Sequence, residues 1–168
     1  MANEEPLPGT GLVEMTVESV RVHMLSSRHV VILKDTDRER YLPIWIGAAE
    51  AAAIALSLQG VVTPRPMTHD LLKNILEDLA IEVQRIVVTE LRDSTFYATI
   101  ELKRQGENFE ISSRPSDAIA LAVRMATPIF ASEDVLSEAS ILIPGDEEEE
   151  VEKFREFLDN VTPEDFEA

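Results

Sequence analysis

The chain has 168 residues, 45% of them hydrophobic, and its 32 acidic and 15 basic residues give a formal net charge of −17. This length and hydrophobic content suit one domain with a sizeable core. The chain contains no cysteine, which excludes a disulfide framework, a thiol nucleophile and cysteine-bound zinc. Because the negative charge repels nucleic acid at long range, any nucleic-acid binding has to use a local basic patch or a bound cation.

The two ends of the chain differ from its centre. Residues 1–12 are predicted to be a disordered extension, since they are acidic and proline-containing and lack the basic and apolar regions of a secretory signal. Residues 48–58 form the longest apolar stretch, which is about half the length that crosses a bilayer. We therefore expect a cytoplasmic protein that does not associate with membranes.

An acidic tail is predicted over residues 144–168, which hold 11 acidic and 2 basic residues and so carry a net charge of −9. Val151, Phe154 and Phe157 recur there at helical spacing, so part of the tail is predicted to be helical. Such a segment is either a solvated helix that docks a few aromatic side chains, or a surface that binds a protein partner or mimics nucleic acid.

Alternation of apolar and polar side chains predicts a strand over residues 13–22. A β-branched run at 30–33 and a strand at 40–46 read as a hairpin around the turn at 35–38. Alanine-rich residues 47–59 then predict a helix.

Gly60 follows this helix at the position where a positive φ is easiest for glycine. After a linker at 61–66, apolar residues at helical spacing predict a second helix that ends near Leu79 and has Thr68 as its N-cap.

The second half begins with a predicted meander of strands at 81–90, 95–102 and 109–112. It continues with a helix at 116–125, a strand at 128–130, a helix at 132–139 and the apolar residues 141–143. Strands and helices alternate too irregularly for a doubly wound parallel sheet. The sequence therefore predicts a single α+β domain over residues 13–143, with a mixed, largely antiparallel sheet and helices packed against it.

Two segments share a pattern in which Arg-Pro precedes a predicted helix: Arg65-Pro66-Met67-Thr68-His69-Asp70 and Arg114-Pro115-Ser116-Asp117. Proline keeps the preceding residue out of the α region, and a hydroxyl and a carboxylate stabilise the helix start. These roles explain the pattern structurally. A functional interpretation is also open, because helix N-termini bind anions and an adjacent arginine can hold a phosphate.

Carboxylates near these helix starts are candidate metal ligands. Asp70, Asp117 and Glu50 could hold a hard divalent cation such as Mg²⁺ or Mn²⁺, which prefers oxygen ligands. His69 could act as a general base or a ligand, or it could be a hydrogen-bonded structural residue. The chain has no phosphate-binding P-loop, no G-x-G-x-x-G, no G-x-S-x-G and no H-E-x-x-H.

His23 and His29 flank a predicted loop that contains Arg28, and they are weaker candidate ligands. The chain also lacks the aromatic and basic stripe of common RNA-binding modules, since aromatic residues make up only 5% of it.

Four segments, taken together and in order, resemble the bifunctional nuclease family. They are Leu42-Pro43-Ile44-Trp45-Ile46-Gly47 with Glu50-Ala51, residues 65–72, Thr95-Phe96-Tyr97-Ala98 and residues 114–122. The resemblance extends from about Val13 to Ser140. It implies an α+β domain that self-associates as a homodimer or higher oligomer, and cleavage of both RNA and DNA, an activity reported for plant members.

The resemblance also implies roles for single residues. In the resulting hypothesis of a metal-dependent nuclease, Asp70, Asp117 and Glu50 hold Mg²⁺ or Mn²⁺, which lowers the pKa of bound water. The catalytic residues are His69, Asp70 and Asp117. Of these, His69 activates water or protonates the leaving oxygen. The phosphate is bound by Arg65, Arg114 and Ser116.

One departure from the family pattern bears on this hypothesis. The strand before the second Arg-Pro commonly carries an acidic residue in the family, whereas Ser112-Ser113 occupy the site here. The alternative is a non-catalytic regulatory or scaffold module that binds a protein partner or a small anionic ligand. The sequence also leaves open whether Asp70 and Asp117 meet, because 47 positions separate them.

Overall fold

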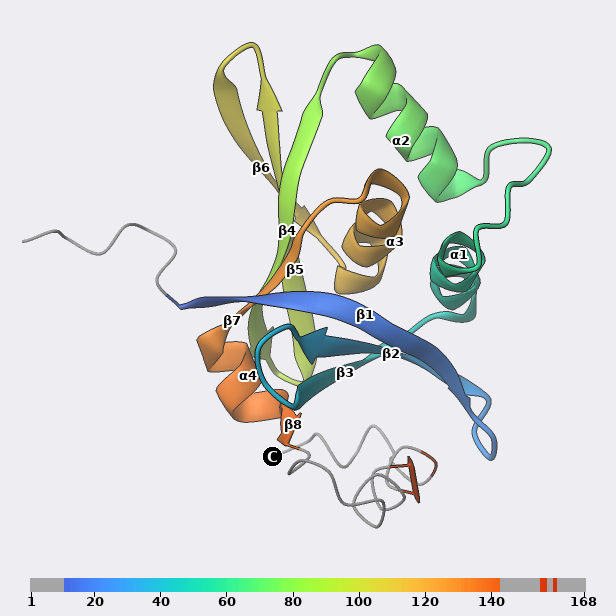
Figure 1. Ribbon diagram of the computed structural model, residues 1–168, viewed down its shortest axis with the longest axis vertical. Coiled ribbons are helices and arrows are strands. Elements are labelled where there is room, and N and C mark those ends of the chain that lie inside the picture. Colours follow the sequence, from blue (N-terminus) through green and yellow to red (C-terminus); the bar gives the residue numbers. More distant parts are fainter. Residues whose placement is uncertain (1–10, 143–154, 157–158, 160–168) are drawn as a thin grey trace, which may run out of the picture.

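The computed structural model describes residues 11–142, 155, 156 and 159, and within residues 11–142 one sheet and four helices form a mixed α+β domain, as predicted (Figure 1). The strands are β1 (Leu12–His23), β2 (Arg28–Asp35), β3 (Arg40–Ile46), β4 (Glu82–Arg92), β5 (Thr95–Arg104), β6 (Glu107–Ser113), β7 (Ile129–Ser132) and β8 (Ile141–Leu142). The helices are α1 (Ala48–Leu58), α2 (Thr68–Asp78), α3 (Pro115–Met125) and α4 (Glu133–Ala139).

The strands form one eight-stranded sheet in the order β6-β5-β4-β7-β1-β2-β3-β8. The pair β4 and β7 is parallel, and the other six neighbouring pairs are antiparallel. Four of the antiparallel pairs follow from short turns between consecutive strands, because a hairpin can connect only antiparallel neighbours. The other two, β1 with β7 and β3 with β8, join strands far apart in the chain. The predicted largely antiparallel sheet is therefore confirmed.

Some boundaries differ from the predictions because tertiary partners decide them. β7 was predicted at 128–130, but it extends to Ser132, since Ala131 and Ser132 pair with Val13 and Leu12 of β1. The predicted N-cap at Thr68 is wrong. Met67 holds that position, and its backbone N–H donates to Asp70 Oδ2 at 3.0 Å. Asp70 thereby replaces the expected hydroxyl in stabilising the start of α2.

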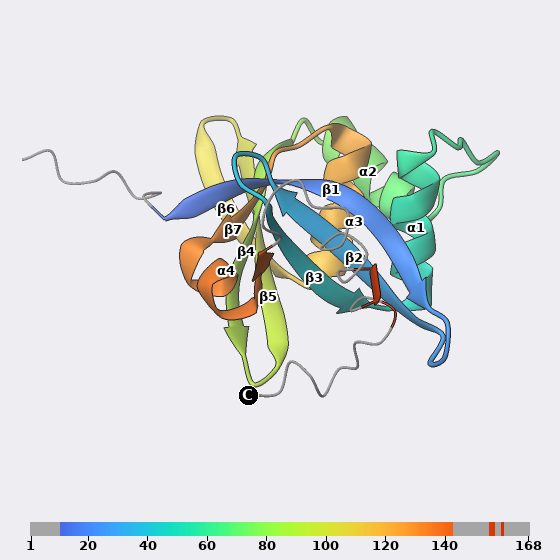
Figure 2. The same cartoon turned by 60° about the horizontal axis from the view of Figure 1, so that its bottom comes forward.

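The core lies between the sheet and the helices, and α4 contributes Val135, Leu136 and Ala139 to it. Helices α1, α2 and α3 lie on the same side of the domain, with α3 between the sheet and the other two, whereas α4 packs beside β7 and β3 (Figures 1 and 2). Residues 118–122 of α3 are fully buried. Ala51 and Ala53 of α1 are buried as well, and their small side chains allow α1 and α3 to approach closely.

The predictions for residues 1–10 and for most of the acidic tail fall outside the described residues. Leu12, which was assigned to the extension, lies in β1. Arg155, Glu156 and Asp159 of the tail are helical and exposed. Among the described residues, no helix has both the length and the apolar character needed to span a membrane.

Candidate functional site

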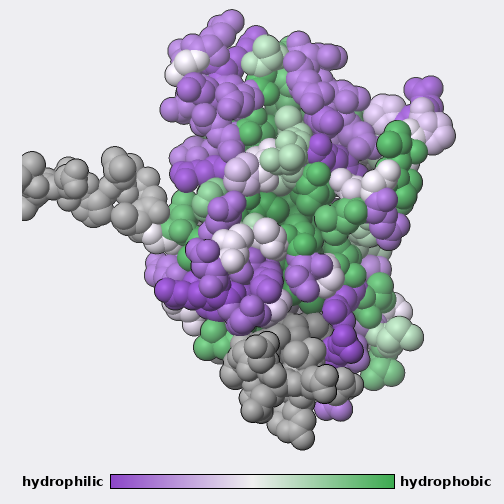
Figure 3. Space-filling view, viewed as in Figure 1, coloured by the Kyte–Doolittle hydropathy of each residue, from purple (hydrophilic) through white to green (hydrophobic). Residues whose placement is uncertain are grey.

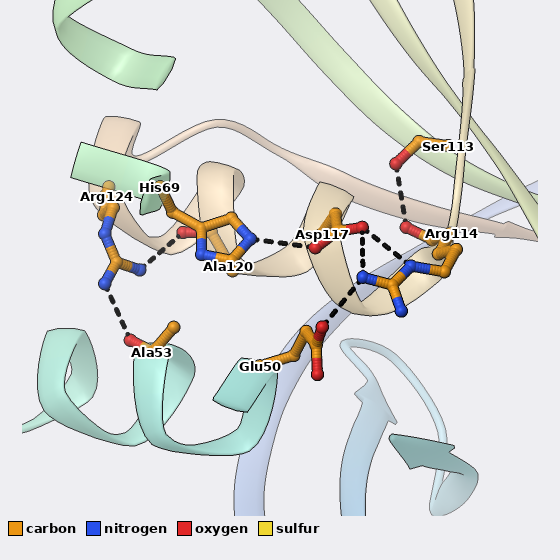
Figure 4. Close-up of polar contacts among 8 residues, drawn as sticks. All are labelled: Glu50, Ala53, His69, Ser113, Arg114, Asp117, Ala120 and Arg124. Carbon is orange, nitrogen blue, oxygen red and sulfur yellow. Dashed lines mark hydrogen bonds and ion pairs between the residues drawn. The ribbon is translucent and has the colours of Figure 1, made fainter. Parts of the chain in front are cut away.

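The N-terminal turns of α1, α2 and α3 meet, and side chains from all three form one connected set of hydrogen bonds (Figure 4). The set runs from Glu50 of α1 through Arg114 and Asp117 of α3 to His69 of α2. We call these four residues the polar cluster. Arg114 and Glu50 are 64 positions apart, so only the packing of the helices brings them together.

Arg114 is the centre of the polar cluster. It is the N-cap of α3, and Pro115 occupies the first helical position, where its missing N–H costs nothing. The guanidinium donates from Nη2 to Glu50 Oε1 at 2.8 Å and from Nε to Asp117 Oδ2 at 2.9 Å. These partners raise the pKa of Arg114, with Glu50 contributing most. The side chain is nevertheless 66% exposed, so it can contact a ligand from solvent.

Glu50 is held in place by the start of its own helix. Its own backbone N–H, and then Arg114, lower the pKa of this carboxyl. The carboxylate lies directly over Gly47, the N-cap of α1, so a Cβ at that position would collide with Glu50 Oε2. A side chain at position 47 would therefore force the Glu50 carboxylate to shift.

His69 and Asp117 form the other end of the polar cluster. His69 Nε2 lies 2.9 Å from Asp117 Oδ1, and the histidine is buried. Asp117 also accepts from Arg114, so both of its oxygens are hydrogen-bonded. Burial raises the pKa of Asp117, but the bonds from His69 and Arg114 outweigh it and the pKa is lowered. Asp117 is thus an ionised carboxylate that binds a proton-carrying ring nitrogen.

Asp70 does not belong to this cluster. Its Oδ1 accepts from Arg124 Nε at 2.7 Å, and its Oδ2 accepts from the Met67 backbone N–H, and these bonds lower its pKa, with Met67 contributing most. Arg124 also donates to the carbonyl oxygens of Ala120 and Ala53. One guanidinium therefore joins α1, α2 and α3, and Asp70 is part of that connection.

The remaining predicted residues lie at different places. Arg65 is exposed in the loop between α1 and α2, where its carbonyl accepts from Thr63 Oγ1. Ser116 is buried at the second position of α3. His23 is buried at the end of β1, where its Nδ1 accepts from the Ser26 backbone N–H. His29 lies in β2. The roles assigned to these residues from the sequence stay predictions.

A pocket of about 430 Å³ adjoins the polar cluster. Its walls come from the start of β2, the end of β3, the turn between β4 and β5, and the start of α3. The lining residues are Arg28, Ile44, Trp45, Ile46, Gly47, Ser94, Thr95, Phe96, Arg114, Pro115 and Ser116. In the part of the chain that the structure describes, this lining has two arginines and no acidic side chain, although the whole chain carries a net charge of −17.

Sequence reasoning missed the roles of Trp45, Phe96 and Arg28 in this pocket. Trp45 and Phe96 occur in the segments that resemble the nuclease family, but nothing in their spacing shows that they share a cavity. In the sequence, Arg28 is distinguished only as a neighbour of two histidines. Its guanidinium lies 5.6 Å from the centroid of the Trp45 ring, a contact that depends on the pairing of β2 with β3.

The carboxylates of the site do not fit a metal centre as they are arranged. Among residues 11–142, 155, 156 and 159, no group of three or more His, Asp or Glu side chains is placed to hold a metal ion. Glu50 and Asp117 share Arg114, whereas Asp70 binds Arg124. Metal dependence therefore stays a prediction from the resemblance.

The fold and the site together define an α+β domain with an exposed arginine, an ionised carboxylate and a buried histidine at converging helix starts beside a pocket. A sequence model of this class, the bifunctional nuclease domain, matches residues 31–144. The chain belongs to the bifunctional nuclease family.

Relatives of two kinds match the chain. An uncharacterized protein of Mycobacterium tuberculosis is 43% identical over 164 residues, which cover 92% of this chain and 98% of the relative. Bifunctional nuclease 1 of Oryza sativa subsp. indica is 26% identical over 66% of this chain and 34% of the relative. Bifunctional nuclease 2 of Arabidopsis thaliana is 29% identical over 52% of this chain and 28% of the relative. The match thus spans about a third of each plant protein.

Proposed function

We propose that this chain is a nuclease that cleaves phosphodiester bonds of RNA or DNA at the polar cluster. One observation carries the proposal: the exposed guanidinium of Arg114 bonds two carboxylates and also lines a pocket whose described lining residues include no acidic side chain. Membership of the bifunctional nuclease family and the names of the plant relatives support the same activity.

Arg114 binds the scissile phosphate in this mechanism. A guanidinium presents a fork of N–H donors that matches two phosphate oxygens, and it stabilises the charge that develops on them. Ser116 lies at the same rim, in the first turn of α3. The positive end of the α3 helix dipole adds to the attraction for an anion. Arg65 is exposed in the loop between α1 and α2 and is not among the residues that line the pocket, so we propose that it contacts a longer strand rather than the reacting phosphate.

The Asp117–His69 pair moves the proton. Water attacks phosphorus, and the pair accepts a proton from it as the new P–O bond forms. The P–O bond to the leaving oxygen breaks, and the pair passes that proton to the leaving oxygen, which returns the pair to its starting state. Asp117 is more exposed than His69, so the carboxylate faces the substrate and His69 stabilises its charge. Glu50 keeps Arg114 in position through the 2.8 Å bond to Nη2. A requirement for Mg²⁺ or Mn²⁺ is a separate prediction.

Self-association is also proposed. Leu71, Leu72 and Ile75 of α2 and its C-cap residue Leu79 are 36–50% exposed, and Phe109 and Ile111 of β6 are 43% and 47% exposed. In the view of Figure 3, hydrophobic surface lies in a strip between β6 and α2, whereas the surface over α2 itself is largely hydrophilic. Apolar area of this kind is typical of a surface that a second copy covers.

The test is cleavage of fluorescent single-stranded RNA and DNA by highly purified protein in Mg²⁺, Mn²⁺ or EDTA. We expect Arg114→Ala to lower the rate by about 10²–10³-fold, the cost of removing a donor that stabilises transition-state charge. Arg92→Ala is the matched control, because Arg92 is similarly exposed but pairs with Glu90 outside the cluster. Equal rates for wild type and a folded Arg114→Ala protein would show that the activity comes from a contaminant or another site.

The alternative function is a non-catalytic module that binds a protein partner or a small anionic ligand. It is favoured by the arginine partners of Glu50, Asp70 and Asp117, which satisfy these carboxylates without a metal ion. This alternative predicts no cleavage by any preparation free of contaminating nuclease. It also predicts that an anion raises the melting temperature of the protein.

A further inference from the structure

We infer that the 430 Å³ pocket binds one nucleotide unit, with its base against Trp45 and Phe96 and its phosphate at Arg114 and Ser116. The inference deepens the proposed function by naming what lies next to the reacting phosphate. It rests on the proposed function in one respect, namely that the bound nucleotide is part of a strand that the protein cleaves. A free mononucleotide and a nucleotide within a strand present the same chemistry to the pocket.

The size and lining of the pocket suit such a ligand. Small-molecule sites are usually cavities of about 300–1,000 Å³, mostly apolar, with a few polar groups that orient the ligand. Here Ile44, Ile46 and Pro115 supply apolar surface, whereas Ser94 and Thr95 supply hydroxyls. The pocket therefore combines a wall for a flat ring with hydrogen-bonding groups.

The charge of the pocket selects an anion. Arg28 and Arg114 line it, and none of its described lining residues is acidic, although Glu50 and Asp117 beside the pocket share the charge of Arg114. In a chain with a net charge of −17, an anionic ligand is repelled by the protein as a whole and gains attraction only where positive charge is concentrated. A phosphate at Arg114 also approaches the first turn of α3, an eleven-residue helix, where backbone N–H groups lack helical partners.

The aromatic residues of the pocket select a ring. Trp45 is already fixed by contacts on two sides, because Arg28 lies 5.6 Å from its ring centroid and the His23 ring lies 6.4 Å away in an edge-on arrangement. The buried Trp45 Nε1 donor has no hydrogen-bond partner among the described residues. A base supplies both a π-face that stacks on an aromatic side chain and carbonyl or ring-nitrogen acceptors. An inorganic anion supplies acceptor oxygens but no π-face.

Trp45 also makes the test direct, since it is the only tryptophan in the chain. We would titrate the full chain with AMP, adenosine and inorganic phosphate, and record tryptophan fluorescence. We expect a saturable change with AMP, and binding at least about tenfold weaker for adenosine and for phosphate, because each lacks one of the two contacts. Absence of a saturable change at about 1 mM AMP, or equal binding of phosphate and AMP, would overturn the inference.

Two variants locate the binding. Phe96→Leu removes the ring and Arg114→Gln removes the cation, and each is expected to weaken AMP binding about tenfold or more. The matched controls are Phe109→Leu in β6 and Arg92→Gln in β4, neither of which lines the pocket. Circular dichroism checks that each variant is folded, and Arg28→Gln replaces any variant that is not. Wild-type affinity in all of the folded pocket variants would contradict the inference.

Cleavage assays separate this inference from the proposed function. AMP binding that depends on Phe96, without any cleavage, would support the pocket and refute the nuclease. Cleavage that Phe96→Leu leaves unchanged, without AMP binding, would support the nuclease and refute the pocket. Tighter binding of a dinucleotide than of AMP would identify the ligand as part of a strand, whereas equal binding would identify a free mononucleotide.

Discussion

Arg124 donates a hydrogen bond from Nε to Asp70 Oδ1 at 2.7 Å, across 54 positions of the sequence. The Arg124 side chain is 7% exposed, and it also bonds carbonyl oxygens of α1 and α3. This contact assigns Asp70 a structural role, because it fixes α2 against the two helices that carry Glu50 and Asp117. The geometry of the polar cluster depends on it.

Arg124→Met is expected to lower the free energy of unfolding by roughly 2–3 kcal/mol, because bonds to a charged group are lost and buried carbonyls lose their donor. Urea unfolding followed by circular dichroism measures the change. Arg21→Met is the control, since Arg21 is exposed and its Nε bonds the hydroxyl of Ser19, two positions away on the same strand. A loss below about 0.5 kcal/mol, as for an ordinary surface change, would contradict the structural role.

Asp117→Asn and Asp70→Asn are expected to act differently. The first removes the charge that faces the proposed substrate and should lower cleavage by about 10²-fold or more while the protein stays folded. The second weakens the bond to Arg124 and should lower the melting temperature, with cleavage changed less than about tenfold at a temperature where the variant is folded. If folded Asp70→Asn lost as much cleavage activity as Asp117→Asn, Asp70 would have a catalytic role.

Gly47→Ala tests the position of Glu50. A Cβ at residue 47 collides with the Glu50 carboxylate and should displace it from its own backbone N–H and from Arg114. Since these two contacts lower the Glu50 pKa, the substitution should raise that pKa toward its ordinary value. A carboxyl NMR titration measures it, with Ala49→Ser on the exposed side of α1 as the control. An unchanged Glu50 pKa would mean that the side chain has room to move.

The stability of the protein should depend on pH through Asp35. Burial raises the pKa of Asp35, but hydrogen bonds from the Asp37 backbone and Arg40 outweigh it, so the folded pKa is lowered. A lowered carboxyl pKa contributes stability that is present above the unfolded value, about 3.9, and is lost as pH falls through the folded pKa. The free energy of unfolding should therefore decrease below about pH 4.

Urea unfolding between about pH 7 and pH 3 measures this dependence. Asp35→Asn should be less stable than wild type at neutral pH and should show a weaker decrease in acid. Asp78→Asn, at an exposed position in α2, is the control. Parallel pH profiles for wild type and Asp35→Asn would show that other carboxylates account for the acid dependence.

Ile75→Lys should disrupt self-association. A charge in the middle of the apolar face of α2 would have to be buried without a partner in the assembly. Light scattering after size exclusion should show an oligomer for wild type and a monomer for the variant. Met24→Lys is the control, because Met24 is 83% exposed in the loop between β1 and β2. An oligomer that Ile75→Lys leaves unchanged would place the interface elsewhere, and a monomeric wild type would refute the proposed self-association.

Local sequence patterns were sufficient for much of the fold. The hairpin before α1, the meander after α2 and the helix starts at Arg-Pro were predicted because hydrophobic periodicity, turn residues and proline act over a few positions. Gly60 has a positive φ of 68°, as expected for the residue after a helix. The prediction of Thr68 as the N-cap of α2 was wrong by one residue. The Asp70 side chain accepts a hydrogen bond from the Met67 backbone N–H, which makes Met67 the N-cap.

The sequence by itself determined the elements, the family and the residue types available for chemistry. The tertiary structure decided which of them meet. It placed Glu50, Arg114, Asp117 and His69 in one cluster, directed Asp70 toward Arg124, and brought Arg28, Trp45 and Phe96 into one pocket. Secondary structure follows from interactions between near neighbours, whereas a site depends on helix packing and strand pairing between residues far apart in the chain, which no local pattern encodes.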